Sequence, residues 1–248
     1  MERNGQAGKI MQRAAFEFIE NVDRFSSADE VMARIGAALH RWGIENHMFS
    51  FIALPTETFA DIALASRLPA GLFDAYNELD LVHHDPGFRH AQRTDHPFRW
   101  FKEALYDPET EPRAQETVDL CRDFGLVDGI VIPFATTARR LGQVWFGGPK
   151  LDVPKRDEPA LHLMALYAFD RVLQIKGVEA TAAKTLTARE REMLTLIASG
   201  KTAQDIADAT SLSKRTVRMH LDNSRSKLGA ATLAQAVMIA IRQRMIMP

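Results

Sequence analysis

The chain of 248 residues has little sulfur chemistry, because Cys121 is its one cysteine. A single cysteine excludes an intramolecular disulfide framework and is typical of a reducing compartment. No activating base stands near Cys121 in the sequence, so we interpret it as a packed helix residue rather than a nucleophile. The sequence also lacks an apolar run long enough to span a bilayer, and its first residues do not resemble a signal peptide. We therefore expect a cytoplasmic protein with no membrane partner.

The chain has almost no net charge, but its charges are unevenly distributed. Residues 186–248 carry ten Lys and Arg against five Asp and Glu, whereas residues 1–185 carry 21 against 27. A small basic segment beside a larger acidic one suggests a nucleic-acid-binding module, although an excess of this size also arises by chance.

Residues 176–185 are poor in large apolar side chains and are predicted to be a linker between two domains, 1–175 and 186–248. In the first domain, apolar spacings of three and four predict helices. These cover 9–22, 28–42, 69–80, 111–124 and 157–176. Apolar or alternating runs at 47–54, 61–66, 129–136 and 141–148 predict strands, the last two joined as a hairpin through 137–140. Helices and antiparallel strands in this order indicate an α+β domain with helices packed on a sheet.

After the linker, every predicted element is a helix, which indicates an all-α domain of four helices. They cover 186–200, 202–210, 214–229 and 232–246. Thr187 with Glu190 three residues later forms a capping-box pattern, and Gly200 and Gly229 are expected to end the first and third helices.

The second and third of these helices are joined by a tight turn and predict a DNA-binding helix-turn-helix. Val217, Leu221 and Leu228 would form the buried face of the second helix of this pair. Residues at its N-terminal end are expected to contact phosphate: Ser213, Lys214, Arg215 and Thr216. Residues on its outer face are expected to reach base edges: Arg218, Met219 and Asp222. An ordinary helical hairpin with a basic, solvated face is the alternative.

The C-terminal segment resembles the LuxR-type DNA-binding domain over nearly its whole length, which favours DNA binding over that alternative. The resemblance rests on Leu186-Thr187, Arg189-Glu190, Leu194, Ala198, Gly200-Lys201, Ile206-Ala207, Arg215-Thr216-Val217, His220-Leu221, Asn223, Lys227-Leu228 and Ala236. Asp222 departs from the family, in which many members carry a basic or neutral side chain at this position.

Residues 69–148 resemble the autoinducer-binding domain of quorum-sensing LuxR-type regulators. The residues that carry this resemblance are Tyr76, Asp85-Pro86, Trp100, Gly129, Pro133 and Gly142. The resemblance implies a five-stranded antiparallel sheet sandwiched by helices, with an N-acyl-homoserine lactone held between sheet and helices. By the same analogy, Asp85 accepts a hydrogen bond from the ligand's amide, Tyr76 offers a hydroxyl, Trp100 packs near the lactone, and Gly129 permits a close backbone approach.

Three positions of the expected ligand site depart from the family pattern. The family usually has tryptophan where this chain has Leu72 and often has tyrosine where it has Leu68, so two donors are lost. Conversely, Trp145 stands where a small hydroxyl residue is usual. Strand alternation places Gln143 and Trp145 on one face of their strand. Trp145 either enters the pocket and partly fills the volume that Leu72 vacates, or is part of the core.

Several histidines lie near the expected site, at positions 83, 84, 90 and 96. Adjacent side chains in a strand or loop point in opposite directions, which disfavours joint chelation by His83 and His84. Neither a metal site nor a catalytic triad is expected, so the chain is not predicted to be an enzyme or to hold a cofactor.

The sequence therefore predicts a ligand-responsive, sequence-specific transcription regulator, a quorum-sensing receptor for an N-acyl-homoserine lactone. The nature of the acyl group stays open, with a short, branched or aryl group among the options. The alternative is a regulator of the same fold that senses a non-lactone molecule or acts without ligand. Expected partners are double-stranded DNA, the autoinducer, a second copy of the chain and RNA polymerase. The 232–246 helix is predicted either to contact the second copy or to complete its own domain's core.

Overall fold

The computed structural model describes residues 2–136, 140–178, 186–242 and 245–247. The chain divides near Val178 into two compact units. Helix α8 ends at Ile175, one residue before its predicted end, and the predicted turn at 137–140 and linker at 176–185 lie largely outside the described residues.

The first unit contains one antiparallel sheet of five strands in the order β2-β1-β5-β4-β3. The strands are β1 (Asn46–Phe51), β2 (Ala63–Arg67), β3 (Phe98–Arg99), β4 (Asp128–Ala135) and β5 (Leu141–Gly148). The predicted α+β class and five-stranded sheet are confirmed. Strand β3 has two residues and no pattern of its own, so sequence periodicity did not reveal it.

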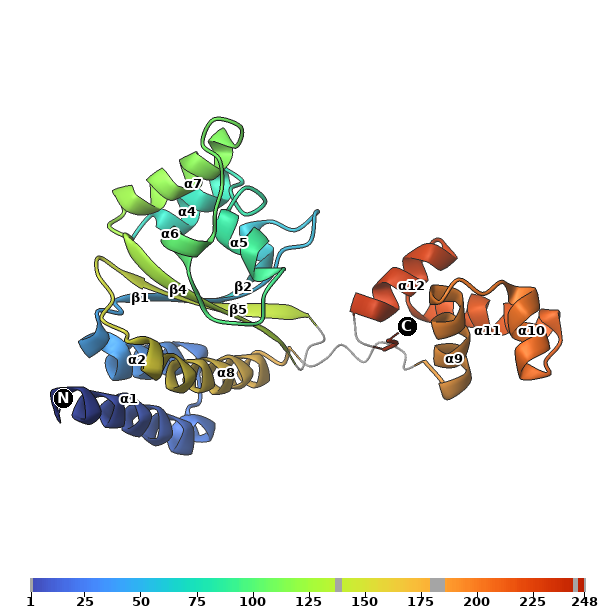
Figure 1. Cartoon of the computed structure of the whole chain (residues 1–248), viewed down its shortest axis with the longest axis horizontal. Helices are drawn as coiled ribbons and strands as arrows, with labels where there is room; N and C mark the ends of the chain where they lie inside the picture. The colour runs from blue at the N-terminus through green and yellow to red at the C-terminus, as the bar shows by residue number, and fades with distance from the viewer. Residues whose placement is uncertain (1, 137–139, 179–185, 243–244, 248) are drawn as a thin grey trace. The chain divides into compact units, whose positions relative to one another are not determined.

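Helices cover both faces of this sheet (Figure 1). On one side lie α2 (Ala28–Leu39) and α8 (Glu158–Ile175), with α1 (Glu2–Asn21) beyond them. On the other side lie α4 (Leu72–Glu78), α5 (Pro86–Ala91), α6 (Trp100–Glu103) and α7 (Pro112–Asp123), while α3 (Phe59–Ile62) leads into β2. The region of the two adjacent histidines, expected to be a strand or loop, is followed directly by helix α5.

Alternation along the strands divides the side chains of the sheet between its two sides. Phe49, Phe51 and Phe134 surround Phe169 of α8, with ring centroids 5.9, 6.0 and 5.0 Å from it. These aromatic contacts form the core beneath the sheet. The intervening residues of β1, β4 and β5 face the α4–α7 layer, where the ligand site was predicted.

The second unit contains four helices, as predicted. They are α9 (Ala188–Ala198), α10 (Ala203–Thr210), α11 (Lys214–Lys227) and α12 (Leu233–Arg242). Thr187 and Glu190 form the predicted capping box. Gly200 and Gly229 follow α9 and α11 with φ of 85° and 62°, a backbone conformation that favours glycine.

One ion pair joins the start of α9 to the end of α11. Lys227 Nζ lies 2.8 Å from Glu190 Oε2, and Glu190 is buried. Burial would raise the pKa of Glu190, but hydrogen bonds from Lys227 and Thr187 outweigh it and hold this pKa below its usual value. Glu190 therefore caps α9 and also anchors α11, the helix that was predicted to enter the major groove of DNA.

Helix α12 contributes mainly to the core of its own domain. Ala236 and Ala240 are fully buried, and Leu233 and Val237 pack against the same core. Ile241 is exposed. Leu233, Ala236, Val237 and Ala240 therefore belong to the core of their own domain. Contact between the exposed face of α12 and a second copy of the chain stays a prediction. Across the described ranges, we find no helix with both the length and the apolarity to cross a membrane.

The β1 side chain His47 is buried on the α2 side of the sheet. Its Nε2 donates to the carbonyl of Met32 over 2.9 Å, and its Nδ1 has no partner among the described residues. Burial, with a smaller contribution from the charge of Arg67, lowers the pKa of His47 from 6.5 to about 4. The neutral ring is thus the form that fits the fold.

This pKa predicts that the first unit loses stability between pH 7 and pH 5. In that window the unfolded chain binds a proton at His47 and the folded chain does not, which lowers the free energy of unfolding by about 2 kcal/mol. Urea unfolding at pH 7, 6 and 5 measures this loss. His47→Gln should reduce the pH dependence, whereas the exposed-site control His83→Gln should leave it unchanged; equal slopes in all three proteins would refute the assignment.

Candidate ligand and DNA sites

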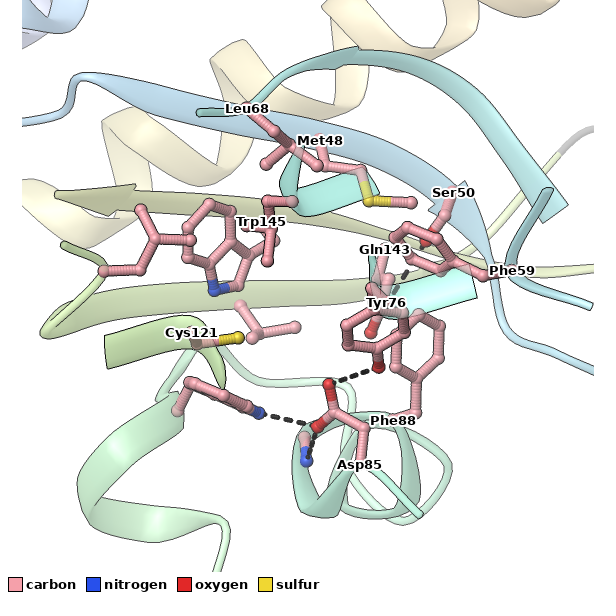
Figure 2. Close-up of a pocket in the computed structure, with 15 residues that line it drawn as sticks. Met48, Ser50, Phe59, Leu68, Tyr76, Asp85, Phe88, Cys121, Gln143 and Trp145 are labelled. Carbon is pink, nitrogen blue, oxygen red and sulfur yellow. Dashed lines mark hydrogen bonds between the residues drawn. The ribbon is translucent and has the colours of Figure 1, made fainter. Parts of the chain in front are cut away.

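A cavity lies between the sheet and the α4–α7 layer, with a volume of about 60 Å³ open to a water-sized sphere. Figure 2 shows its walls, which are mostly apolar and aromatic. The residues that line it are Met48, Ser50, Phe59, Leu68, Leu72, Tyr76, Asp85, Gly87, Phe88, Trp100, Cys121, Leu126, Val131, Gln143 and Trp145. A mostly apolar concavity with a few convergent polar groups is the usual form of a small-molecule site.

The carboxylate of Asp85 is the charged group in this wall. Its Oδ2 accepts a hydrogen bond from the Tyr76 hydroxyl at 2.8 Å. Its Oδ1 accepts from Trp100 Nε1 at 2.8 Å and from the Gly87 backbone N–H at 2.6 Å. Figure 2 shows these hydrogen bonds as dashed lines that converge on Asp85, with Tyr76 labelled as one of the donors. The structure thus brings together Tyr76, Asp85 and Trp100, as the sequence predicted.

Burial raises the pKa of Asp85 above its ordinary value, while the donors around the carboxylate, Tyr76 and Trp100 foremost, lower it. Burial, with the Asp85 charge second, also raises the pKa of Tyr76, so its hydroxyl stays protonated and can donate. The resemblance predicted the ligand's amide as the hydrogen-bond donor to this carboxylate. Instead, protein donors already supply three of the roughly four hydrogen bonds that it can accept.

Local geometry explains how Asp85 reaches its place. Asp85 is the N-cap of α5 and Pro86 occupies the first turn, a combination that favours helix initiation. A Cβ atom on Gly87 would collide with the Trp100 indole, so glycine at this position lets the indole approach Asp85. The sequence Asp85-Pro86 therefore contained a helix-start signal that the sequence analysis did not use.

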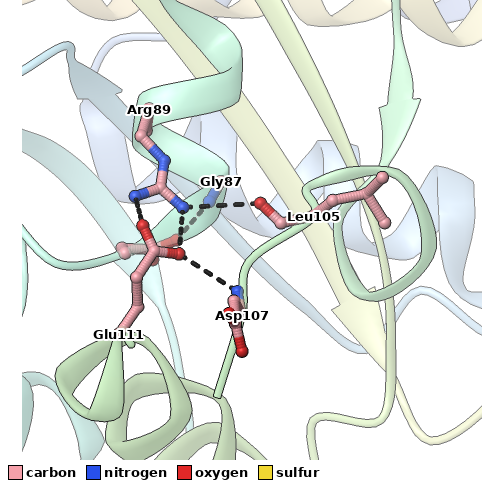
Figure 3. Close-up of polar contacts among 6 residues, drawn as sticks. Gly87, Arg89, Leu105, Asp107 and Glu111 are labelled. Carbon is pink, nitrogen blue, oxygen red and sulfur yellow. Dashed lines mark hydrogen bonds and ion pairs between the residues drawn. The ribbon is translucent and has the colours of Figure 1, made fainter. Parts of the chain in front are cut away.

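An ion pair fastens α5 to the segment before α7 (Figure 3). Arg89 contacts both carboxylate oxygens of Glu111, with Nη2 3.0 Å from Oε2, and Nη2 also lies 3.4 Å from the Leu105 carbonyl. The backbone N–H of Asp107 donates to Glu111 at 3.2 Å. These contacts hold the helix that carries Asp85 against the α7 side of the cavity.

The indole of Trp145 lies in the cavity wall and rests on two glycines. Gly129 and Gly147 are paired across β4 and β5. A Cβ on Gly129 would lie 2.9 Å from Trp145 Nε1, and one on Gly147 would collide with the far edge of the ring. Gly129 therefore makes room for Trp145 and is not among the residues that line the cavity, so its role toward a ligand stays a prediction. Trp145 both lines the cavity and packs against the sheet.

Leu68 and Leu72 line the same cavity, where neither side chain can donate a hydrogen bond. Several of the lining residues were not predicted from the sequence. Strand alternation could have identified Met48 and Ser50, and Gln143 was placed on the Trp145 face but was not assigned to the site. Burial raises the pKa of the Cys121 thiol, which agrees with its interpretation as a packed residue.

The predicted DNA-facing side of α11 is a separate surface in the second unit. Val217 and Leu221 are buried, and Leu228 packs against the core, as predicted. The exposed residues of the opposite face border a shallow depression: Lys214, Arg215, Arg218, Met219, Asp222 and Asn223. Ser213 caps the helix through its bond to the Thr216 N–H at 3.1 Å.

Asp222 lies within this basic surface and pairs with Arg225, one turn further along α11, at 3.5 Å. The departure from the family pattern is thus partly neutralised within the helix. Among the described residues, the ion-pair partner of Asp222 is Arg225 and not Lys214, Arg215 or Arg218.

The histidines beside the cavity do not form a metal centre. His83 and His84 are exposed, His96 lies beside Asp95, and the His90 ring packs on Phe98 with centroids 4.4 Å apart. The described residues hold no group of three or more His, Cys, Asp or Glu placed to bind a metal ion.

Two family models match the chain. One is described as an autoinducer binding domain and covers residues 27–172, and the other is described as bacterial regulatory proteins of the luxR family and covers residues 184–240. Together they span both units of the structure.

Related proteins match over nearly their full length. The transcriptional activator protein BjaR1 of Bradyrhizobium diazoefficiens is 35% identical over 95% of this chain and 97% of its own. The quorum sensing-dependent transcriptional regulator RpaR of Rhodopseudomonas palustris is 29% identical over 94% and 95%. The crystal structure of Escherichia coli SdiA has the same fold, with a TM-score of 0.68 and 20% identity over 94% of this chain and 98% of that one.

The donor cluster predicts that Tyr76→Phe destabilises the first unit. The change leaves the buried Asp85 carboxylate with one donor fewer, which costs about 1–3 kcal/mol. The matched control is Tyr106→Phe, because the Tyr106 hydroxyl bonds Gln115 in a partly exposed position. Urea unfolding of both variants at pH 7 tests this prediction. Equal midpoints for the two variants would show that the Tyr76–Asp85 hydrogen bond contributes no more to the free energy of unfolding than the Tyr106–Gln115 bond.

Proposed function

The chain belongs to the luxR family of bacterial transcription regulators with an autoinducer-binding domain, and on this premise we propose that it is a quorum-sensing receptor for an N-acyl-homoserine lactone. The observation that carries the proposal is the Asp85 carboxylate, held in an apolar cavity by three donors. A carboxylate acceptor with a fixed orientation in an apolar wall is suited to an amide N–H, which has one hydrogen to donate.

The two oxygens of Asp85 have different roles in this proposal. Oδ1 is occupied by Trp100 and Gly87, whereas Oδ2 accepts from Tyr76 and has a lone pair left for the ligand amide. Trp100 then packs near the lactone. Leu68, Leu72 and Trp145 complete the ligand wall with apolar surface, which favours a short, branched or aryl acyl group over a long chain.

Leu72 supports a second candidate, a regulator of this fold that senses a non-lactone molecule or acts without ligand. A leucine offers no N–H for a lactone carbonyl, and protein groups supply three hydrogen bonds to Asp85. SdiA, which shares this fold, has been crystallised in complex with octanoyl-rac-glycerol. The same cavity could therefore hold an acylated molecule of another kind.

The DNA half of the proposal rests on the exposed face of α11. Ser213, Lys214, Arg215 and Thr216 contact phosphate, and Arg218, Met219 and Asp222 face base edges. The regulator acts as a homodimer because two such helices read two-fold-symmetric half-sites. RNA polymerase is the further partner of a regulator bound at a promoter.

Ligand binding predicts a rise in melting temperature of the full-length protein. At a ligand concentration of 100 times Kd, binding contributes about 2.7 kcal/mol, which corresponds to a rise of roughly 5–10 °C. The measurement is thermal unfolding against a panel of alkyl- and aryl-acyl-homoserine lactones. A rise for one member of the panel identifies the acyl class.

Asp85→Asn should abolish this ligand-induced rise, because the carboxamide cannot replace an acceptor held by three donors. The matched control is Asp80→Asn, which removes an exposed carboxylate outside the cavity and tolerates its positive φ of 48°. Each variant is compared with itself, with and without ligand. No rise with any lactone in a folded protein that still binds DNA would favour the second candidate.

Base reading by Arg218 predicts a selective loss of affinity in Arg218→Ala. The loss should be about 1–3 kcal/mol on a selected DNA site and much smaller on random DNA at the same salt concentration. Arg215→Ala is the matched control, because loss of a phosphate contact weakens both complexes alike. Equal losses in Arg218→Ala would reassign Arg218 to the phosphate backbone.

A further inference from the structure

A pair of polar side chains interrupts the apolar sheet wall of the cavity. Ser50 of β1 and Gln143 of β5 are cross-strand partners and both line the cavity. They are almost fully buried, at 1% and 5% exposure. Their neighbours along the same face, Met48 and Trp145, are apolar or aromatic. The pair is therefore a localised polar group on a wall that otherwise favours hydrocarbon.

The hydrogen-bonding capacity of Gln143 is not met by the protein. Its Nε2 lies 3.4 Å from Ser50 Oγ, at the limit of a hydrogen bond, and its Oε1 has no partner among the described residues. Rotating the carboxamide by 180° exchanges the two atoms, so Oε1 then faces Ser50 and Nε2 is left unpaired. In either orientation one buried polar atom of Gln143 lacks a partner, which is unfavourable.

The ring of Trp145 does not cover this carboxamide. Gln143 precedes Trp145 by two residues on the same face of β5, and Gly147 follows it by two. Because the indole lies over Gly129 and Gly147, it extends away from Gln143 along the sheet. Figure 2 shows Gln143 and Trp145 on the sheet side and Asp85 on the opposite, helical side. A ligand held at Asp85 can therefore present its acyl group to Gln143.

We propose that Ser50 and Gln143 form a specificity site for a hydroxyl group on the acyl part of the ligand. A hydroxyl both donates and accepts, so it satisfies the unpaired atom of Gln143 in either orientation of the carboxamide. A plain alkyl or phenyl group at this place leaves that atom buried without a partner. This inference rests on the proposed function and adds the chemical class of the acyl group: hydroxyalkyl or hydroxyaryl.

The test compares lactones that differ by one hydroxyl. Full-length protein is titrated with 3-(4-hydroxyphenyl)propanoyl- and 3-phenylpropanoyl-homoserine lactone, and with 6-hydroxyhexanoyl- and hexanoyl-homoserine lactone. The protein should bind the hydroxylated member of at least one pair about 3- to 10-fold more tightly. Equal affinity within both pairs, or tighter binding of both unsubstituted members, overturns the inference.

Gln143→Met removes the carboxamide with little change in volume and should abolish or reverse the preference. Ser50→Ala should reduce it, and provides the test if Gln143→Met does not fold. The matched control is Gln92→Met, because Gln92 is exposed and outside the cavity. A preference that persists undiminished in both cavity variants also overturns the inference.

The outcomes separate this inference from the proposed function. If unsubstituted lactones bind in an Asp85-dependent manner and the hydroxyl adds nothing, the receptor function holds and the Gln143 site does not. If neither these four lactones nor any member of the wider panel binds, the proposed function fails and the specificity site fails with it.

Discussion

The buried carboxylate of Asp85 is the constraint on which the sensing unit depends. A charge in an apolar wall is tolerated when donors surround it, and here the donors come from three segments of the chain. Tyr76 lies on α4, Gly87 on α5 and Trp100 on α6, so a single side chain joins the helices that cover one face of the sheet. The hydrogen bonds that position Asp85, the proposed acceptor for the ligand amide, therefore also hold the helices of the cavity wall together.

The same wall shows how this chain compensates for its departures from the family pattern. Leu72 and Leu68 give up two donors on the helical side, while Trp145 adds a large ring on the sheet side. The ring fits because Gly129 and Gly147 stand side by side beneath it, and a side chain at either position would displace it. The loss and the gain thus belong to one cavity, whose remaining polar side chains include Asp85 and Gln143.

Local patterns predicted most of the fold because their causes lie within a few residues. The Thr187–Glu190 capping box, the glycines that end α9 and α11, and the apolar alternation of β4 and β5 are of this kind. Resemblance, not periodicity, singled out Tyr76, Asp85 and Trp100 as ligand-site residues, but it did not predict the hydrogen bonds among them. What could not be predicted depends on register between distant segments, such as the pairing of Ser50 with Gln143 or the meeting of Arg89 with Glu111.

The unpaired atom of Gln143 and the satisfied carboxylate of Asp85 lead to different expectations for the empty and the occupied cavity. Because protein groups already donate three hydrogen bonds to Asp85, this wall can form before the ligand binds. The ligand is not required to supply hydrogen bonds to an otherwise unpaired carboxylate. Gln143, in contrast, gains its missing partner from the ligand. Discrimination between ligands should therefore arise at the sheet, where a hydrogen bond is still to be made, more than at Asp85, where every acyl-homoserine lactone offers the same amide.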